Sequence, residues 1–139
     1  RGIQITKDYP PEEIVLKVQK AKLFHVLLNI LKNAIDALQN NPDDNRHITI
    51  SMGKKNGSIE LRIIDNGEGI ERKNLDRIFT HGFTTKKQGQ GFGLHSCSNY
   101  IKEIGGELGV ESEGKGMGSS FIIHFQSYKL EQCKETTVY

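Results

Sequence analysis

A helical repeat of apolar residues in the first third of the chain limits most strongly how this sequence can fold. Between Lys20 and Asn41 the apolar side chains recur every three or four residues, the spacing of one face of an α-helix. The residues that carry the repeat are Leu23, Leu27, Ile30, Leu31, Ala34 and Leu38. Asn40, Asn41 and Pro42 predict its end. A long amphipathic helix of this kind must bury its apolar stripe against a second layer.

The rest of the chain alternates between strand-like and helix-like segments. Alternating apolar and polar residues predict strands over residues 3–7, 47–52, 58–65, 107–112 and 119–125. Gly53 and Asn56-Gly57 predict a hairpin-like turn between the second and third of these strands. Shorter helices are expected near 73–79 and over 94–104, the latter ending at Gly105-Gly106. The pattern predicts an α/β (α+β) two-layer sandwich: a mixed, mostly antiparallel sheet of about five strands with about three helices on one face.

Length and composition bound the class of protein. The 139 residues suit one domain with one core, and 35% hydrophobic with 26% charged residues is a globular composition. A net charge of +2, spread over interspersed acids and bases, argues against a nucleic-acid partner. No apolar run approaches the roughly 18 residues of a membrane span, so we expect no direct membrane contact by this domain.

Chain organisation and cysteine usage complete this outline. We assign residues 1–128 to one domain and 129–139 to a C-terminal tail, which is either disordered or cut from a longer chain. Because the chain opens on Arg1 rather than Met, we expect a fragment of a larger protein. Cys97 and Cys133 lie far apart, without a metal-ligand spacing, and are typical of free thiols in a reducing, cytoplasmic compartment.

A row of polar residues follows the side of the long helix away from its leucines. Asn29, Asn33 and Asp36 fall within a narrow arc at 100° per residue. One interpretation is an ordinary solvated face. The other is a site beside magnesium or phosphate, because amide oxygens are hard ligands and Mg²⁺ often takes only one or two protein oxygens. The helix by itself does not decide between them.

A second polar feature is Asp65, followed by Gly67 and Gly69. Period two places Asp65 on the same face as the apolar residues of the strand before it, so its carboxylate needs a donor. The exocyclic amine of adenine is one suitable donor, and the glycines let the backbone approach a flat ring. The alternative is an aspartate that simply begins a tight turn.

A third feature is the run Gly89, Gly91, Gly93 and Leu94 directly before a predicted helix. Free backbone N–H groups at such a position can bind an anion. The run is neither a dinucleotide fingerprint, since no strand precedes it, nor a Walker A loop, since the G-K-[ST] ending is absent. A mobile lid over phosphates and an ordinary flexible loop both remain open.

Five short motifs occur in one order along the chain. They are Asn29-x-x-x-Asn33-Ala34, Asp65-x-Gly67-x-Gly69, Phe79-Thr80-His81-Gly82-Phe83-Thr84-Thr85-Lys86, Gly89-x-Gly91-x-Gly93-Leu94 and Gly118-Ser119-Ser120-Phe121. In this order they resemble the N box, first glycine box, F box, second glycine box and last-strand motif of the catalytic ATP-binding domain of sensor histidine kinases. The resemblance implies the Bergerat fold of the GHKL superfamily, shared with DNA gyrase, heat-shock chaperones and mismatch-repair ATPases.

The resemblance also implies ATP and Mg²⁺ as cofactors and a role for each motif residue. Asn33 would coordinate Mg²⁺, with Asn29 and Asp36 beside it. Asp65 would accept from the adenine amine, helped by a water that Ser119 holds. The residues that would line the adenine slot, contact the phosphates or belong to the lid are Gly67, Gly69, Ile70, Phe83, Thr84, Thr85, Lys86, Gly89, Gly91, Gly93 and Leu94.

Two departures from the wider superfamily refine this expectation. The ATPase relatives carry a glutamate base where this chain has Asn29, which cannot take a proton, so transfer is favoured over hydrolysis. None of the five histidines precedes an acidic residue, so we expect the acceptor histidine on a dimerisation domain outside this chain. A response regulator would be the further partner. The alternatives are a serine kinase or slow ATPase of the same superfamily, and a non-catalytic nucleotide-sensing or docking module.

Overall fold

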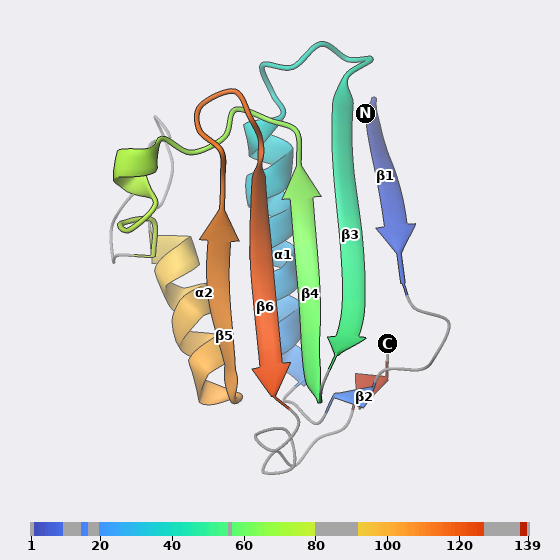
Figure 1. Cartoon of the computed structure of the whole chain (residues 1–139), viewed down its shortest axis with the longest axis vertical. Coiled ribbons are helices and arrows are strands. Elements are labelled where there is room, and N and C mark those ends of the chain that lie inside the picture. The colour runs from blue at the N-terminus through green and yellow to red at the C-terminus, as the bar shows by residue number, and fades with distance from the viewer. Residues whose placement is uncertain are drawn as a thin grey trace.

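The computed structural model describes residues 2–9, 15–16, 20–55, 57–79, 92–126 and 137–138. The strands span Ile3–Asp8 (β1), Val15–Leu16 (β2), Arg46–Lys55 (β3), Ser58–Asp65 (β4), Gly106–Glu111 (β5), Ser119–Gln126 (β6) and Thr137–Val138 (β7). A five-stranded sheet has the order β1-β3-β4-β6-β5, and a small sheet pairs β2 with β7 (Figure 1). Strands β1 and β3 are parallel and the other neighbours in the large sheet are antiparallel, which confirms the predicted mixed sheet.

Strand β3 continues beyond the segment that alternation predicts. It stays in the sheet as far as Lys55, opposite Ser58, so the chain reverses between these two residues, as the Asn56-Gly57 pair predicts. Gly53 lies inside the strand, and its predicted place in the turn is wrong. A Cβ built on Gly53 would meet no heavy atom within 4 Å, so packing does not require a glycine at this position. The chain reverses near Gly57, whose φ of 81° favours glycine. This long hairpin places Asp65 at the far end of β4.

The helices described by the structure are α1 (Lys20–Ala37), α2 (Phe92–Glu103) and a short 3-10 helix, η1 (Arg72–Asn74). Helix α1 ends before the predicted Asn41. In a continued α-helix the Ala37 carbonyl would accept the Asn41 N–H. It accepts the Glu68 N–H instead, at 2.9 Å, and the Asn41 N–H donates to Leu38. Contact with the loop after β4 therefore sets the end of α1.

Helices α1 and α2 both cover one face of the large sheet (Figure 1). The side chains buried between these layers come mostly from α1, α2 and β6: Leu23, Val26, Ile30, Ala34, Cys97, Ile101, Phe121, Ile123 and Phe125. Of the predicted leucine stripe, Leu38 is buried, whereas Leu27 and Leu31 are only half-buried. The buried arc of α1 is turned toward α2, because this helix packs beside α1 as well as on the sheet.

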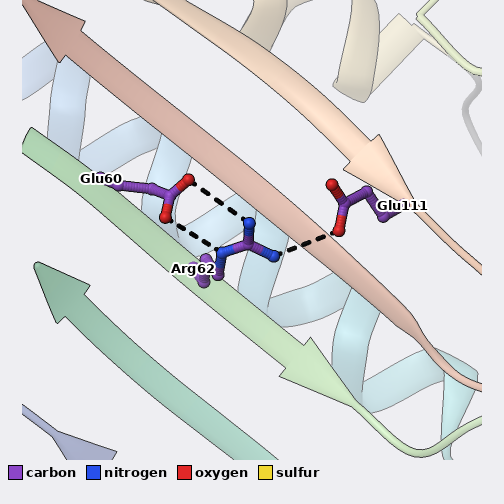
Figure 2. Close-up of polar contacts among 3 residues, drawn as sticks. All are labelled: Glu60, Arg62 and Glu111. Carbon is purple, nitrogen blue, oxygen red and sulfur yellow. Dashed lines mark hydrogen bonds and ion pairs between the residues drawn. The ribbon is translucent and has the colours of Figure 1, made fainter.

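The other face of the sheet carries polar side chains. Arg62 of β4 donates to Glu60 on its own strand and reaches across β6 to Glu111 of β5, with N···O distances of 3.2 Å to each (Figure 2). These three side chains are partly exposed, and such surface ion pairs stabilise a fold by only about 0–1 kcal/mol. Burial on the helix-covered face therefore dominates stability.

The predicted C-terminal tail is described at two residues only. Thr137 and Val138 form β7, which pairs antiparallel with β2. The division of the chain at residue 128 stays a prediction.

Candidate functional site

Asp65 is held at the end of β4 as a buried, oriented carboxylate. Its side chain shares the core-facing side of the strand with Ile63, as period two predicts, and the residue is 4% exposed. Oδ1 accepts the Gly67 N–H at 2.9 Å, and Oδ2 accepts the Ser119 hydroxyl at 2.9 Å. Burial raises the pKa of Asp65 above its ordinary value, while the hydrogen bonds from Gly67 and Ser119 oppose the rise.

Ser119 lies next to Asp65 because of sheet register. It is the first residue of β6 and pairs with Asp65 across the two antiparallel strands. We expected Ser119 to hold a water that helps Asp65 bind the adenine amine, and the structure adds a direct hydrogen bond between the two side chains. A carboxylate has about four lone-pair sites, so Asp65 can accept from another donor besides Gly67 and Ser119.

The loop after Asp65 is pressed against the end of α1. A Cβ on Gly67 would overlap the carbonyl oxygen of Ala37, so only glycine fits at this close approach. The Glu68 N–H donates to that same oxygen at 2.9 Å. The first glycine motif is therefore attached to the helix that carries Asn29 and Asn33.

The loop between β5 and β6 supports the site, although of its residues only Gly118 belongs to a predicted motif. Gly116 donates its N–H to Glu68 at 2.6 Å, and Gly118 donates to Gly67 at 3.1 Å. The Ser112 hydroxyl accepts the Ile70 N–H at 3.1 Å and donates to the Gly118 carbonyl at 2.7 Å. The available signal was the glycine run directly before Ser119, whose strand partner is Asp65.

The polar residues of α1 lie beside its buried stripe. Asn29, Asn33 and Asp36 are half-buried, and helical spacing places them on the side from which Lys22 and His25 contact Tyr100 of α2. A Cβ on Gly93 would lie 3.9 Å from the Asn29 Oδ1, so the start of α2 adjoins this row. The structure thus brings the first amide of the N-box motif, Asn29, close to the last glycine of the second glycine motif.

The first turn of α2 carries Gly93, Leu94 and His95. All three are half-buried. The His95 ring places Nδ1 3.1 Å from the Phe79 carbonyl oxygen, and Nε2 3.3 Å from the side-chain nitrogen of Asn99. His95 therefore links Phe79, which precedes the glycine-rich segment in the sequence, to helix α2, which follows it. The other predicted residues of this segment lie outside the described residues: Phe83, Thr84, Thr85, Lys86, Gly89 and Gly91.

The donors on α1 fit magnesium better than a transition metal. Within the described ranges, no group of three or more histidine, cysteine or acidic residues is placed to hold a metal ion. What α1 offers is two amides and the Asp36 carboxylate. Such hard oxygens suit Mg²⁺ when substrate phosphates and waters supply the remaining ligands.

Comparison with known proteins identifies the class to which this fold and site belong. Residues 18–129 match the family described as histidine kinase-, DNA gyrase B-, and HSP90-like ATPase, and the chain belongs to this family. The catalytic domain of histidine kinase ThkA has the same fold, with a TM-score of 0.78 and 26% identity over 91% of this chain and 80% of that chain. The predicted resemblance and fold are confirmed.

Two curated relatives are sensor-type kinases. The chain is 35% identical over 126 residues to the sensor histidine kinase ZraS of Escherichia coli strain K12, covering 88% of this chain and 25% of the relative. It is 32% identical over 113 residues to sporulation kinase D of Bacillus subtilis strain 168, covering 81% and 22%. The chain thus spans about a quarter of the length of these relatives. None of the helices in the described segments has the length and apolar character to cross a membrane.

Proposed function

We propose that this chain is the ATP-binding catalytic domain of a two-component sensor histidine kinase. It holds Mg-ATP and delivers the γ-phosphate to a histidine on a dimerisation domain outside this chain. The observation that carries the proposal is the buried Asp65 carboxylate, oriented by Gly67 and Ser119 and attached through its loop to the asparagine-bearing helix α1.

Asp65 supports the adenine end of this proposal. A buried carboxylate with spare lone pairs selects a donor such as the exocyclic amine of adenine, since an unpaired charge at this depth is unfavourable. Gly67 and Gly69 let this loop pack closely against Ala37 of α1 and Gly114 of the β5–β6 loop, which holds Asp65 and its neighbours in place, and Ile70 offers an apolar wall. Gly67 and Ser119 each hold one oxygen of the Asp65 carboxylate, so the orientation of the group toward a further donor is fixed.

The row on α1 supports the phosphate end. Asn33 would hold Mg²⁺ through its side-chain oxygen, with Asn29 and Asp36 beside the metal or its waters. Bound Mg²⁺ would neutralise charge on the phosphate groups during transfer. Gly93 and Leu94 at the start of α2 offer backbone N–H groups to the phosphates. Phe83, Thr84, Thr85, Lys86, Gly89 and Gly91 are proposed to complete this end.

The chemistry of Asn29 favours transfer over hydrolysis. An amide cannot accept a proton from water, so the site lacks a general base at this position. Phosphoryl transfer to an imidazole needs positioning and charge neutralisation instead, because the acceptor is itself the nucleophile. The proposed partners are the dimerisation domain of the same protein and a response regulator, and the proposed location is the cytoplasm.

A calorimetric titration of the chain with Mg-ADP tests the binding part of the proposal. We expect binding by the unmodified chain and loss of its Mg²⁺-dependent component in Asn33→Ala, with the fold retained. Gln39→Ala removes an exposed amide just beyond α1 and serves as the matched control, with binding unchanged. Absence of binding by the unmodified chain would revive a docking module, and normal binding by Asn33→Ala would reject the metal assignment.

Phosphorylation of the full-length protein tests the transfer part. With radiolabelled ATP we expect an acid-labile, base-stable label, the signature of phosphohistidine, and none in the Asn33→Ala protein. An acid-stable label would indicate a serine kinase instead. Release of inorganic phosphate without a labelled protein would indicate a slow ATPase.

A further inference from the structure

The side chain of His25, one helical turn before Asn29, has no assigned role in the function proposed for this chain. Both nitrogen-bound hydrogens of the Asn29 amide have an acceptor on this one residue. Nδ2 lies 3.0 Å from the His25 backbone oxygen and 3.1 Å from the His25 ring nitrogen Nε2. Because a carbonyl oxygen only accepts, Nδ2 must be the end of the amide that faces His25. Nε2 then accepts as well, and the ring carries its hydrogen on Nδ1.

This arrangement fixes which atom of Asn29 faces the proposed site. With both N–H groups directed at His25, Oδ1 points away from it, toward the start of α2 near Gly93. Among the described residues, Oδ1 of Asn29 accepts no hydrogen bond. A half-buried amide oxygen with open lone pairs, beside the helix start that is proposed to bind phosphate, is suited to a cation or to its water shell.

The His25 ring is itself held by helix α2. Its edge packs on Tyr100 with ring centroids 5.2 Å apart and planes inclined by 68°. The Lys22 ammonium lies 5.7 Å from the centre of the same Tyr100 ring and forms an ion pair with Glu103. Contacts between α1 and α2 therefore determine where the ring sits.

We propose that His25 is a positioning residue for the magnesium–nucleotide site, holding the Asn29 amide with Oδ1 turned toward the metal. The backbone oxygen alone would leave one N–H of Asn29 free and its side chain able to rotate. The ring nitrogen removes that freedom. The inference rests on the proposed function, since it assumes that a metal–nucleotide complex lies beside Asn29.

The test compares nucleotide binding with and without Mg²⁺ in matched variants. His25→Phe keeps an aromatic ring against Tyr100 and removes the acceptor. His25→Gln restores an acceptor oxygen. His124→Phe makes the same change as the first variant on the sheet face opposite α1 and α2. ADP titrations are run by calorimetry in Mg²⁺ and in EDTA.

We expect His25→Phe to weaken ADP binding in Mg²⁺ about fivefold, the size of one lost hydrogen bond, and to leave binding in EDTA unchanged. His25→Gln and His124→Phe should match the unmodified chain. Unchanged affinity of His25→Phe in Mg²⁺ would overturn the inference, and so would an equal loss in EDTA, which indicates a merely structural role. No Mg²⁺-dependent binding by the unmodified chain would overturn the proposed function and this inference with it.

A second measurement is independent of nucleotide. The side-chain NH₂ group of Asn29 gives a pair of signals in a two-dimensional NMR spectrum of the labelled chain. We expect these signals to move in His25→Phe and to return toward their original positions in His25→Gln. Signals that stay in place in His25→Phe would contradict the hydrogen bond on which the inference depends.

Discussion

At the scale of single residues, burial and nucleotide binding are expected to favour opposite protonation states of Asp65. The nucleotide is proposed to need its ionised form, while burial raises its pKa above the ordinary value of 3.8. The folded state therefore binds this proton more tightly than the unfolded state does. The protonated form of Asp65 therefore contributes stability that is fully present below the ordinary pKa. This contribution falls as pH rises from the ordinary pKa to the raised one, and it is absent at higher pH.

Asp65→Asn should remove this pH-dependent contribution. The amide can accept the Gly67 N–H through Oδ1 and donate to Ser119, whose hydroxyl can rotate. We expect the variant to be at least as stable as the unmodified chain near pH 7. It should bind ADP about tenfold or more weakly, because its Nδ2 group and the adenine amine are both hydrogen-bond donors. Urea unfolding between about pH 4 and pH 7 and ADP calorimetry measure both effects. A large loss of stability at neutral pH would show that the charge itself stabilises the fold.

Cys97 is a second residue whose chemistry follows from burial. The residue is fully buried between α1 and α2, and desolvation raises its pKa to about 11. At about pH 8 the thiol therefore stays protonated and inaccessible. We expect alkylation of Cys97 in the native chain to be far slower than in urea, as measured by mass spectrometry of the peptide that contains it. Rapid native alkylation would contradict the packing between the two helices.

At the scale of elements, the first glycine loop is a contact surface between β4 and α1. Gly67 has no room for a methyl group because the Ala37 carbonyl oxygen lies against it. Gly67→Ala should separate the loop from the end of α1, breaking the Glu68–Ala37 hydrogen bond and weakening both ADP binding and stability, the latter by about 1–3 kcal/mol. Thermal unfolding and ADP calorimetry provide the two readouts.

Gly109→Ala is the matched control for this prediction. Gly109 lies within β5, and a Cβ on it would meet no heavy atom within 4 Å. We therefore expect wild-type ADP affinity and equal or slightly higher stability, because alanine restricts the unfolded chain more than glycine does. Equal effects of the two alanine substitutions would mean that close packing does not explain Gly67.

The same elements explain how much the sequence could predict. Local periodicity was enough to place Asp65 on the core-facing side of β4, because alternation acts over neighbouring residues. It could not place the end of α1 at Ala37. That end depends on the Ala37 carbonyl oxygen, which accepts the N–H of Glu68 from a loop distant in sequence. Gly53 was misplaced for the same reason, as strand pairing outweighs the turn preference of one glycine.

At the scale of the whole molecule, the two faces of the sheet differ in what covers them. The helices cover one face, which carries the core and the Asp65 end of the site, while the other face carries ion pairs such as those of Arg62 (Figure 2). The motifs meet only because this layer arrangement brings α1, the end of β4 and the start of β6 together. The order of the motifs in the sequence was therefore enough to indicate the family. The contacts between the motifs could be found only from the folded structure.

Neighbouring residues of β4 allow a direct test of this two-layer arrangement. Ile63 points into the helix-covered core and is 3% exposed, whereas the Arg62 side chain points to the other face and is 31% exposed. We expect Ile63→Ala to lower the free energy of unfolding by about 2–5 kcal/mol, through lost burial and the cavity left behind. Arg62→Ala should lower it by only about 0–1 kcal/mol, because water replaces its exposed ion pairs. Urea unfolding of both variants measures the difference. Similar losses would mean that the Arg62 face is covered in solution, and that the single-sided core is not the main source of stability.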